Sequence, residues 1–512
     1  MEAQQEEQRA QFGGKLGFIL AAIGSAIGLG NIWRYPYIAY ENGGGAFLLP
    51  YFIALVTAGI PVLILEYGLG HRSRSAAPFA FRAMSRKWEW LGWWQIGGSF
   101  VIMTYYIVII GWVLSYCYYS FGTQWGSDPD TFFNDSYLGL TDSFWMIGGM
   151  QWKVVLATAI VWAVTYWLLR RGVSKGIELA AKVLIPTLVL MIAVIVVRGL
   201  TLPGAVQGLN VLLTPDFGEL LNPNVWVAAY GQVFFSIGVA FSIMITYSSY
   251  LPRRTDLSNS AFIVALANTG FEFFAALGVF SVLGFLAVQQ NAPIDEVVTQ
   301  GVGLAFVAFP QIINELPALN SLFGLLFFGA LLFAGITSAV SILECGIAGV
   351  KEKFNLSRTA AVNWMCGLCA LASILFATKG GLYYLDVVDR FVNNFGLVLV
   401  ALVEVVLISW VLRQLGTLQN HVNERSYIRI GNWWVYSLSI ITPIILIIVM
   451  ALNFYNEFTT RYGDYPLSGL IIMGWGVAVG LPVIGFILQS VRSRDGGDSQ
   501  ASGAGTTKDE EV

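Results

Sequence analysis

Long uninterrupted runs of apolar residues recur along almost the whole of this chain. Runs such as 183–197, 323–333 and 438–452 contain no charged residue. With their flanks they approach the roughly 20 residues that a helix needs to cross the hydrocarbon of a bilayer. A transmembrane barrel would instead alternate polar and apolar positions over segments of about 10 residues. The pattern therefore predicts an all-α integral membrane protein.

About twelve transmembrane helices are expected from these runs. We predict them near residues 14–39, 44–71, 91–122, 152–170, 176–199, 225–250, 258–287, 321–350, 358–377, 381–413, 433–454 and 466–491. Segments 124–150, 200–224 and 290–318 are then the substantial outer loops, and none of them resembles a separate soluble domain. The segment 494–512, rich in Gly, Ser and acidic residues, is expected to be a disordered cytoplasmic tail.

Composition supports a membrane protein and argues against a nucleic-acid partner. Hydrophobic residues make up 56% of the chain and charged residues 12%, whereas about a quarter of the residues of soluble domains are charged. The basic residues are scattered among loops and form no single stripe of the kind that binds nucleic acid. The expected partners are therefore the lipid bilayer and a small molecule, and the oligomeric state stays unknown.

The sidedness of charge predicts the orientation. Five basic residues fill the loop 72–87, while the long loop that follows carries four Asp residues and no Lys or Arg. Basic loops stay on the cytoplasmic side. Both termini, including the segment 1–13, are therefore expected to be cytoplasmic.

Two predicted spans are interrupted by small residues, the first at 24–31 (GSAIGLGN) and the sixth at 236–241 (SIGVAF). Irregular backbone at membrane depth persists only where it is buried in protein or lines a cavity, because an unpaired peptide group in hydrocarbon costs several kcal/mol. Paired breaks in corresponding spans indicate a transporter built from inverted repeats, with its site at the midplane. Close packing of helices through Gly24 and Gly28 remains an alternative explanation.

Several polar side chains lie inside these apolar spans. A broken helix presents amide N–H groups to a carboxylate and free carbonyls to a cation, so an amino acid and sodium would suit it. The candidate oxygen ligands are Asn31, Ser236, Asn268, Thr337 and Ser338. For Thr337 and Ser338, a hydrogen bond to the carbonyl one turn back is an equally ordinary role.

Glu272 is a carboxylate in the middle of a predicted span, one helical turn after Asn268. Such residues usually mark ion paths or proton relays. The i, i+4 spacing places Glu272 and Asn268 on one face of the helix. For Glu66, Glu344 and Glu404 a structural role in hydrogen bonding between helices remains open.

The string GSAIGLGNIWRYPYIAYENGGGAF at 24–47 closely resembles the first two helices of the neurotransmitter:sodium symporter family, in its bacterial amino-acid transporter branch. The resemblance continues through TYYIVIIGW (104–112), RRGVSKGIE (170–178), GQVFFSIGVAF (231–241), ITYSSY (245–250) and FAGITSAVSIL (333–343). It implies a five-plus-five inverted repeat with discontinuous helices 1 and 6. The repeats would span 14–199 and 225–413, followed by two further helices in 433–491.

The resemblance also implies ligands. The first sodium site would use Ala26 (carbonyl), Asn31, Ser236, Asn268 and the substrate carboxylate; the second would use the carbonyls of Gly24, Ile27 and Ala334 and the hydroxyls of Thr337 and Ser338. The substrate would be bound by Ala26, Leu29, Gly30, Ile102, Tyr106, Phe235, Gly238, Phe241, Ser338 and Ile342. Two sodium ions and no organic cofactor are expected.

Two positions narrow the function by the same resemblance. Gly28 stands where monoamine transporters of the family carry an Asp, which favours an amino acid over a monoamine. Glu272 stands where chloride-dependent members carry a Ser, so chloride should be dispensable and proton counter-transport becomes a hypothesis. The implied outer gate pairs Arg34 with Asp389, and the implied inner gate uses Arg9 and Glu352, with Tyr250 nearby.

The sequence thus predicts a sodium-coupled symporter, and no enzyme, that imports an apolar α-amino acid by alternating access across a prokaryotic inner membrane. Alternatives are a sensor or channel of the same fold, or a proton-coupled amino-acid carrier. The amino acid itself, the sodium stoichiometry and the role of the C-terminal tail are left open.

Overall fold

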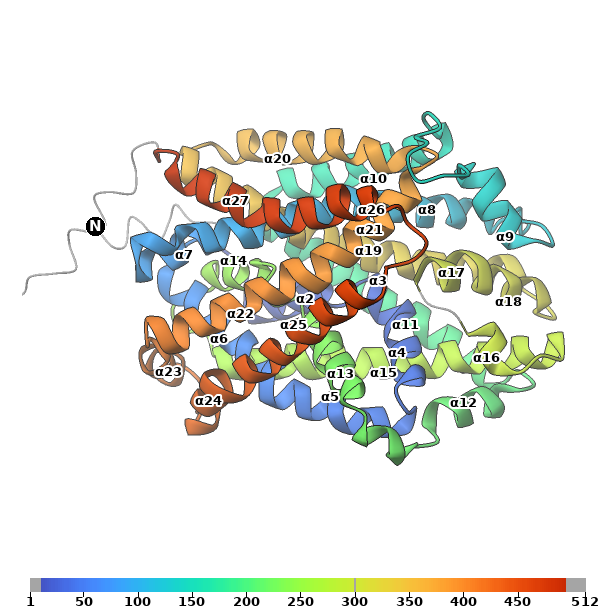
Figure 1. Cartoon of the computed structure of the whole chain (residues 1–512), viewed down its shortest axis with the longest axis horizontal. Helices are drawn as coiled ribbons and strands as arrows, with labels where there is room; N and C mark the ends of the chain where they lie inside the picture. The colour runs from blue at the N-terminus through green and yellow to red at the C-terminus, as the bar shows by residue number, and fades with distance from the viewer. Residues whose placement is uncertain (1–10, 299–300, 494–512) are drawn as a thin grey trace, which may run out of the picture.

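Helices make up the described structure of this protein, a computed structural model in which residues 11–298 and 301–493 are described. The helices run roughly parallel to the longest axis of the molecule and lie side by side (Figure 1). Two isolated β-bridges, Gly44 with Pro215 and Met150 with Thr378, fasten loops to neighbouring segments. The prediction of an all-helical membrane protein is confirmed.

Among the described residues, ten helical stretches are long and apolar enough to cross a membrane, and one bent pair of helices adds an eleventh. The shorter helices Pro223–Ser236 and Ile243–Ser249, which are not among these eleven, occupy the remaining predicted span. The segments, in chain order, are α2 (Lys15–Ala26) with α3 (Leu29–Trp33) and α4 (Tyr35–Glu41); α5 (Leu48–Ala54) with α6 (Ile60–Ser73); α8 (Glu89–Tyr119); α10 (Trp152–Arg170); α11 (Leu179–Leu200); α13 (Pro223–Ser236) with α14 (Ile243–Ser249); α15 (Leu257–Gln290); α19 (Asn320–Phe354); α20 (Arg358–Ser373); α21 (Gly381–Phe391) with α22 (Val398–Val406); α24 (Asn432–Tyr436) with α25 (Thr442–Thr459); and α26 (Leu467–Gly469) with α27 (Gly476–Ser490).

These segments follow the predicted spans closely, and the two interrupted ones are those expected. The axis bends by 57° between Lys15–Ala26 and Leu29–Glu41. The sixth segment is divided between α13 and α14 by the non-helical residues 237–242. The interrupted segments are thus the first and sixth in chain order, as a five-plus-five arrangement requires. The boundaries proposed for the two repeats stay a prediction.

Short helices occupy the connections, including the three loops expected to lie outside. They are α7 (Ala77–Met84), α9 (Pro129–Thr131), α12 (Ala205–Leu213), α16 (Ile294–Val297), α17 (Gly301–Gly303), α18 (Phe309–Glu315) and α23 (Leu415–Asn423). α12 lies tightly against α15, because a Cβ added at Gly208 would meet the carbonyl oxygen of Phe280 at 1.8 Å.

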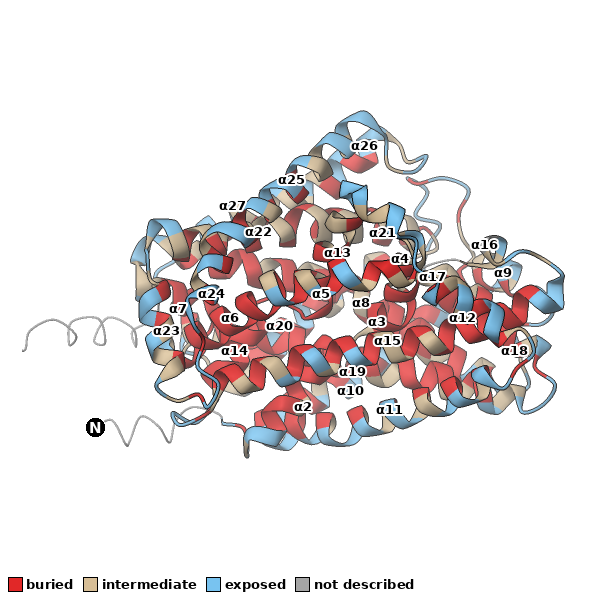
Figure 2. Cartoon of the chain, turned by 90° about the horizontal axis from the view of Figure 1, so that it is seen from below, coloured by how far each residue is buried: buried red, intermediate tan, exposed pale blue. Residues whose placement is uncertain are grey.

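Burial distinguishes central from peripheral helices. In the most apolar window of α15 and of α19, 78% of the residues are buried inside the protein, whereas in that of Leu467–Ser490 only 28% are. Buried residues fill the middle of the bundle and exposed residues follow its outer helices (Figure 2). The exposed side chains of α27 include Val483, Ile484 and Phe486, as a lipid-facing helix requires. The interrupted segments therefore sit in the protected centre.

Candidate functional site

A cavity of about 550 Å³ lies between the two helix breaks. Its walls come from the α2–α3 break, from α8, from the α13–α14 break and from α19 and α21. All ten residues predicted to bind the substrate line it: Ala26, Leu29, Gly30, Ile102, Tyr106, Phe235, Gly238, Phe241, Ser338 and Ile342. The cavity gathers them into one place, and their role as ligands stays a prediction.

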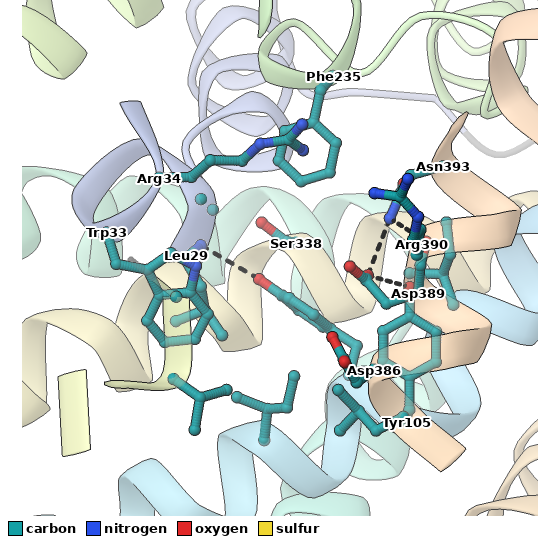
Figure 3. Close-up of a pocket in the computed structure, with 18 of the residues that line it drawn as sticks. Leu29, Trp33, Arg34, Tyr105, Phe235, Ser338, Asp386, Asp389, Arg390 and Asn393 are labelled. Carbon is teal, nitrogen blue, oxygen red and sulfur yellow. Dashed lines mark hydrogen bonds between the residues drawn. The ribbon is translucent and has the colours of Figure 1, made fainter. Parts of the chain in front are cut away.

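The first break exposes the beginning of α3 to this cavity. Ile27 is extended, and the N–H of Gly28 donates to Asn31 Oδ1 at 2.8 Å. The next amide, that of Leu29, is 3.4 Å from the hydroxyl of Tyr106 (Figure 3). A helix N-terminus with free amides favours a negatively charged group. The space beside Tyr106 and Leu29 can therefore receive a carboxylate.

The second break depends on backbone that helices do not allow. Gly238, Ala240 and Ser242 have φ values of 66°, 65° and 61°, in the left-handed region that residues other than glycine seldom adopt. Two polar contacts hold the segment: the N–H of Ala240 donates to Glu66 Oε1 at 2.6 Å, and Ser99 donates to the carbonyl of Phe241 at 2.8 Å. The peptide groups that helical bonding would satisfy are thus used to fix the cavity wall.

The polar side chains predicted for the first sodium site meet next to the cavity, which Asn31 lines. Asn31 donates to Asn268 Oδ1 at 2.9 Å, and Asn268 donates to the hydroxyl of Ser236. All three side chains are buried. They come from α3, α13 and α15, so the site exists only when both broken segments and α15 are packed together. Their oxygens are the ligand type that sodium prefers.

Glu272 lies beside this group and is fully buried. Its carboxylate accepts hydrogen bonds from Tyr51, from Gln232 at 2.9 Å and from Asn31 at 3.2 Å. Sequence reasoning did not identify Tyr51 or Gln232. Gln232 carried a signal, a polar amide in an apolar span, whereas nothing distinguishes Tyr51 from the other aromatic residues of its helix. Three donors satisfy the charged form of Glu272 without a basic residue.

The residues predicted for the second sodium site also converge, between α2 and α19. Ser338 Oγ is 3.4 Å from the carbonyl oxygens of Gly24 and Ile27. Thr337 Oγ1 is 3.0 Å from the carbonyl of Ala334, and equally 3.0 Å from that of Phe333. The hydroxyl of Thr337 thus makes the ordinary bond one turn back, yet it stands in the same oxygen-rich cluster.

The two residues of the predicted outer gate, Arg34 and Asp389, are separated in this structure. The Arg34 guanidinium lies 4.6 Å from the centre of the Phe235 ring. Asp389 instead accepts from Tyr105 at 2.6 Å and Asn393 at 2.8 Å. Figure 3 shows Arg34 and Asp389 on separate walls of the cavity. These two side chains, both within the described part of the chain, form no ion pair. Beyond them the cavity continues to the connection 460–466 between α25 and α26.

The opposite, predicted cytoplasmic, end is held by buried and partly buried polar contacts. Glu352 accepts from the N–H of Ala76 at 3.0 Å. Tyr250 donates to Glu344 at 2.8 Å, and Glu344 forms an ion pair with Arg358 at 2.8 Å. Arg9, the predicted partner of Glu352, lies outside the described residues. Arg358 was not predicted, because its distance from Glu344 depends on how α20 returns along α19.

Comparison with known proteins gives a consistent result. The model of the sodium:neurotransmitter symporter family matches residues 9–128 and 123–492. An uncharacterized sodium-dependent transporter of Methanocaldococcus jannaschii is 41% identical over 489 residues, covering 96% of this chain and 99% of its own. A sodium- and chloride-dependent taurine transporter of Canis lupus familiaris is 28% identical, over 92% of this chain and 83% of its own. A sodium-dependent dopamine transporter of Caenorhabditis elegans is 29% identical, over 89% and 82%.

Proposed function

Since this chain belongs to the sodium:neurotransmitter symporter family, we propose that it imports an apolar α-amino acid together with sodium by alternating access. The family consists of sodium-dependent membrane transporters, which are not enzymes. The observation that carries the proposal is a cavity bounded by both helix breaks, with the amide and hydroxyl oxygens of Asn31, Asn268 and Ser236 next to it.

The substrate's carboxylate would lie against the amides of Leu29 and Gly30 and the Tyr106 hydroxyl. Support comes from the 3.4 Å separation of Tyr106 from the Leu29 amide, which leaves this donor pair only weakly satisfied by each other. A Cβ on Gly28 would come within 3.2 Å of Ser338 Oγ and 3.3 Å of Tyr106. An acidic side chain at Gly28 would accordingly have to displace these two hydroxyls, which favours a negative charge that arrives with the substrate.

The substrate's side chain would enter the apolar part of the cavity. Ile102, Phe235, Phe241 and Ile342 line it. A Cβ on Gly238 would have no atom within 4 Å, so this wall leaves space for an aliphatic or aromatic group. Charged side chains are disfavoured because no complementary charge lies among these residues.

Two sodium ions are proposed at the two oxygen clusters. The first would be held by the carbonyl of Ala26, by Asn31, Ser236 and Asn268, and by the substrate itself. The second would be held by the carbonyls of Gly24, Ile27 and Ala334 and by the hydroxyls of Thr337 and Ser338. Because the substrate completes the first cluster, binding of substrate and sodium would be mutually dependent.

Glu272 would make transport independent of chloride, because it supplies a fixed negative charge next to the first sodium site. Its three donors, Tyr51, Gln232 and Asn31, support an ionised carboxylate while sodium is bound. After sodium leaves, a proton would neutralise it for the return step, which makes proton counter-transport part of the proposal.

The transport cycle would close the outer gate and then open the inner one. Closure would bring Tyr106 over Phe235 and join Arg34 to Asp389, which face the same cavity. Opening of the other side would release the contacts around Glu352 and Tyr250. We place the protein in a prokaryotic inner membrane with both termini cytoplasmic, in agreement with the charge of its loops.

Uptake into proteoliposomes tests the proposal. With an inward sodium gradient and no chloride, labelled apolar amino acids should accumulate, and replacing sodium by potassium should abolish accumulation. Accumulation driven by a proton gradient without sodium would favour a proton-coupled carrier instead. Binding without accumulation would favour a sensor. A panel of unlabelled amino acids then identifies the substrate by competition.

A further inference from the structure

Two carboxyl groups outside the proposed sodium sites are buried next to each other in the bundle. Glu66 belongs to α6 and Glu404 to α22, and both side chains are fully buried. Glu66 accepts from Ala240, whereas Glu404 accepts from Gln95, which stands one helical turn before the Ser99 that donates to Phe241. Both carboxyl groups therefore lie around the break between α13 and α14. Neither has an ion pair with a basic side chain in the part of the chain that the structure describes. Two neighbouring buried carboxylates without a cation cannot both stay ionised.

Among residues 11–298 and 301–493, each of these carboxyl groups has one hydrogen-bond donor. The N–H of Ala240 donates to Glu66 Oε1 at 2.6 Å, and Gln95 Nε2 donates to Glu404 Oε2 at 2.6 Å. The other oxygens, Glu66 Oε2 and Glu404 Oε1, are buried without a partner. Glu272 differs, since three donors satisfy it. Two explanations are open for the unpartnered oxygens of Glu66 and Glu404: either one carboxyl group carries a proton, or a hydrogen-bond donor is missing.

The side chain of Gln95 favours the explanation that a carboxyl group carries a proton. Its carbonyl oxygen, Oε1, is also buried without a partner, although its Nε2 bonds Glu404. A neutral carboxylic acid and an amide form a cyclic pair, in which the amide N–H donates to one acid oxygen and the acid O–H donates to the amide oxygen. One proton on Glu404 Oε1 would satisfy both unpartnered oxygens, Glu404 Oε1 and Gln95 Oε1.

We propose that Glu404 is a proton-binding site, that its neutral carboxyl pairs with the amide of Gln95, and that loss of this proton loosens the break between α13 and α14. The proton removes one of the two adjacent negative charges, so that Glu66 is the ionised member of this pair. Deprotonation would set two charges against each other in a region with no basic partner.

The contacts explain how this proton would reach the transport cavity. Glu66 holds the amide of Ala240, which has a positive φ of 65°. The adjacent residue, Phe241, lines the cavity, and its carbonyl accepts from Ser99 on α8. Ser99 stands one helical turn after Gln95 on α8. The proton on Glu404 therefore acts on both polar contacts that fix the break.

The carboxylic acid can be observed directly by infrared spectroscopy of the purified full-length protein in detergent, titrated with pH without substrate and in saturating sodium, which keeps Glu272 ionised. The wild type should show a protonated-carboxyl C=O band that disappears on alkalinisation. Glu404→Gln should lack this band, while Glu272→Gln, a matched change of another buried acid, should retain it. Glu66→Gln should also retain it, and should lose it at a lower pH, because no neighbouring negative charge then opposes ionisation of Glu404.

Transport supplies the second measurement, and it rests on the proposed function. Uptake by the wild type at saturating sodium should fall several-fold from acidic to alkaline pH, and Glu404→Gln, which mimics the neutral acid, should remove most of this dependence. In saturating sodium, a protonated-carboxyl band that Glu404→Gln leaves intact would overturn the proton site. Failure of the wild type to accumulate any amino acid would instead overturn the proposed symport and leave the spectroscopic assignment standing.

Discussion

The space beside Tyr106 and Ser338 in the cavity depends on one residue, Gly28, which has no side chain. A Cβ there would lie 3.2 Å from Ser338 Oγ and 3.3 Å from Tyr106, tighter than an unstrained contact. Tyr106 is the hydroxyl nearest the Leu29 amide. Even the smallest side chain must therefore displace a group that is proposed to bind the substrate carboxylate.

We expect Gly28→Ala to weaken substrate binding about tenfold, the effect of losing one hydrogen bond to a charged group worth about 1.4 kcal/mol. Thermal stability should change little. The measurement is equilibrium binding, in saturating sodium, of the labelled amino acid selected by the competition panel. Gly231→Ala is the matched control, because a Cβ there meets no atom within 4 Å. Unchanged affinity in Gly28→Ala would contradict the carboxylate position.

Single residues also show which parts of the site were predictable. Asn31 and Asn268 were identified because an amide in an apolar span is unusual. In the structure Asn31 donates a hydrogen bond to Asn268. Tyr51 could not be found in this way, since a tyrosine in a membrane helix is ordinary. Its bond to Glu272 depends on how α5 packs against α15, which no local pattern specifies.

At the scale of elements, the short helix α23 is attached to the bundle by the two histidines of the chain. His71 Nε2 is 3.0 Å from the carbonyl of Pro252, and His71 Nδ1 is 2.9 Å from His421 Nε2. A carbonyl only accepts, so Nε2 of His71 carries a proton. Neutral His71 then accepts at Nδ1 from the N–H of His421. The bond between the rings needs at least one neutral ring, because two charged imidazoles offer no acceptor to each other.

Acidification should therefore loosen this attachment. Burial, followed by the nearby His71 and Arg425, lowers the pKa of His421 from 6.5 to about 4. The unfolded chain takes up the proton first, so the folded state loses stability as pH falls from 6.5 toward 4, and the pair contributes no pH dependence above 6.5. Thermal unfolding in detergent across this range should show a smaller decrease for His421→Gln than for the wild type. Equal decreases would exclude the histidine pair as the cause.

The positions of the membrane-spanning helices could be predicted from the sequence, whereas the structure of the connections between them could not. Apolar runs long enough to span a bilayer leave little alternative to a helix, so the spans follow the predicted ranges. α12 lies in a segment expected to be a loop, and its sequence AVQGLNVLL is too short to signal a span. It is helical because it packs on α15 through Gly208, a contact between segments far apart in the chain.

For the molecule as a whole, the structure is open toward one end and closed at the other. The cavity extends beyond Arg34 and Asp389, while Arg358, Glu344 and Tyr250 join α14, α19 and α20 at the opposite end. Glu344 is fully buried. Removing the partner of a buried charge costs about 3–5 kcal/mol. If alternating access separates these helices, that cost falls on the closed state and shifts the population toward the conformation open at this end.

Cys345, fully buried next to Glu344, can report this shift. In a protein whose only cysteine is Cys345, Arg358→Ala should raise the rate of labelling by a membrane-permeant thiol reagent at least about a hundredfold, because 3 kcal/mol corresponds to that population change. Arg358→Lys should restore much of the protection, and Arg425→Ala, whose ion pair with Glu424 is exposed, is the matched control. Equal labelling in Arg358→Ala and the control, with both proteins folded, would mean that the ion pair supports the bundle in every conformation and does not gate it.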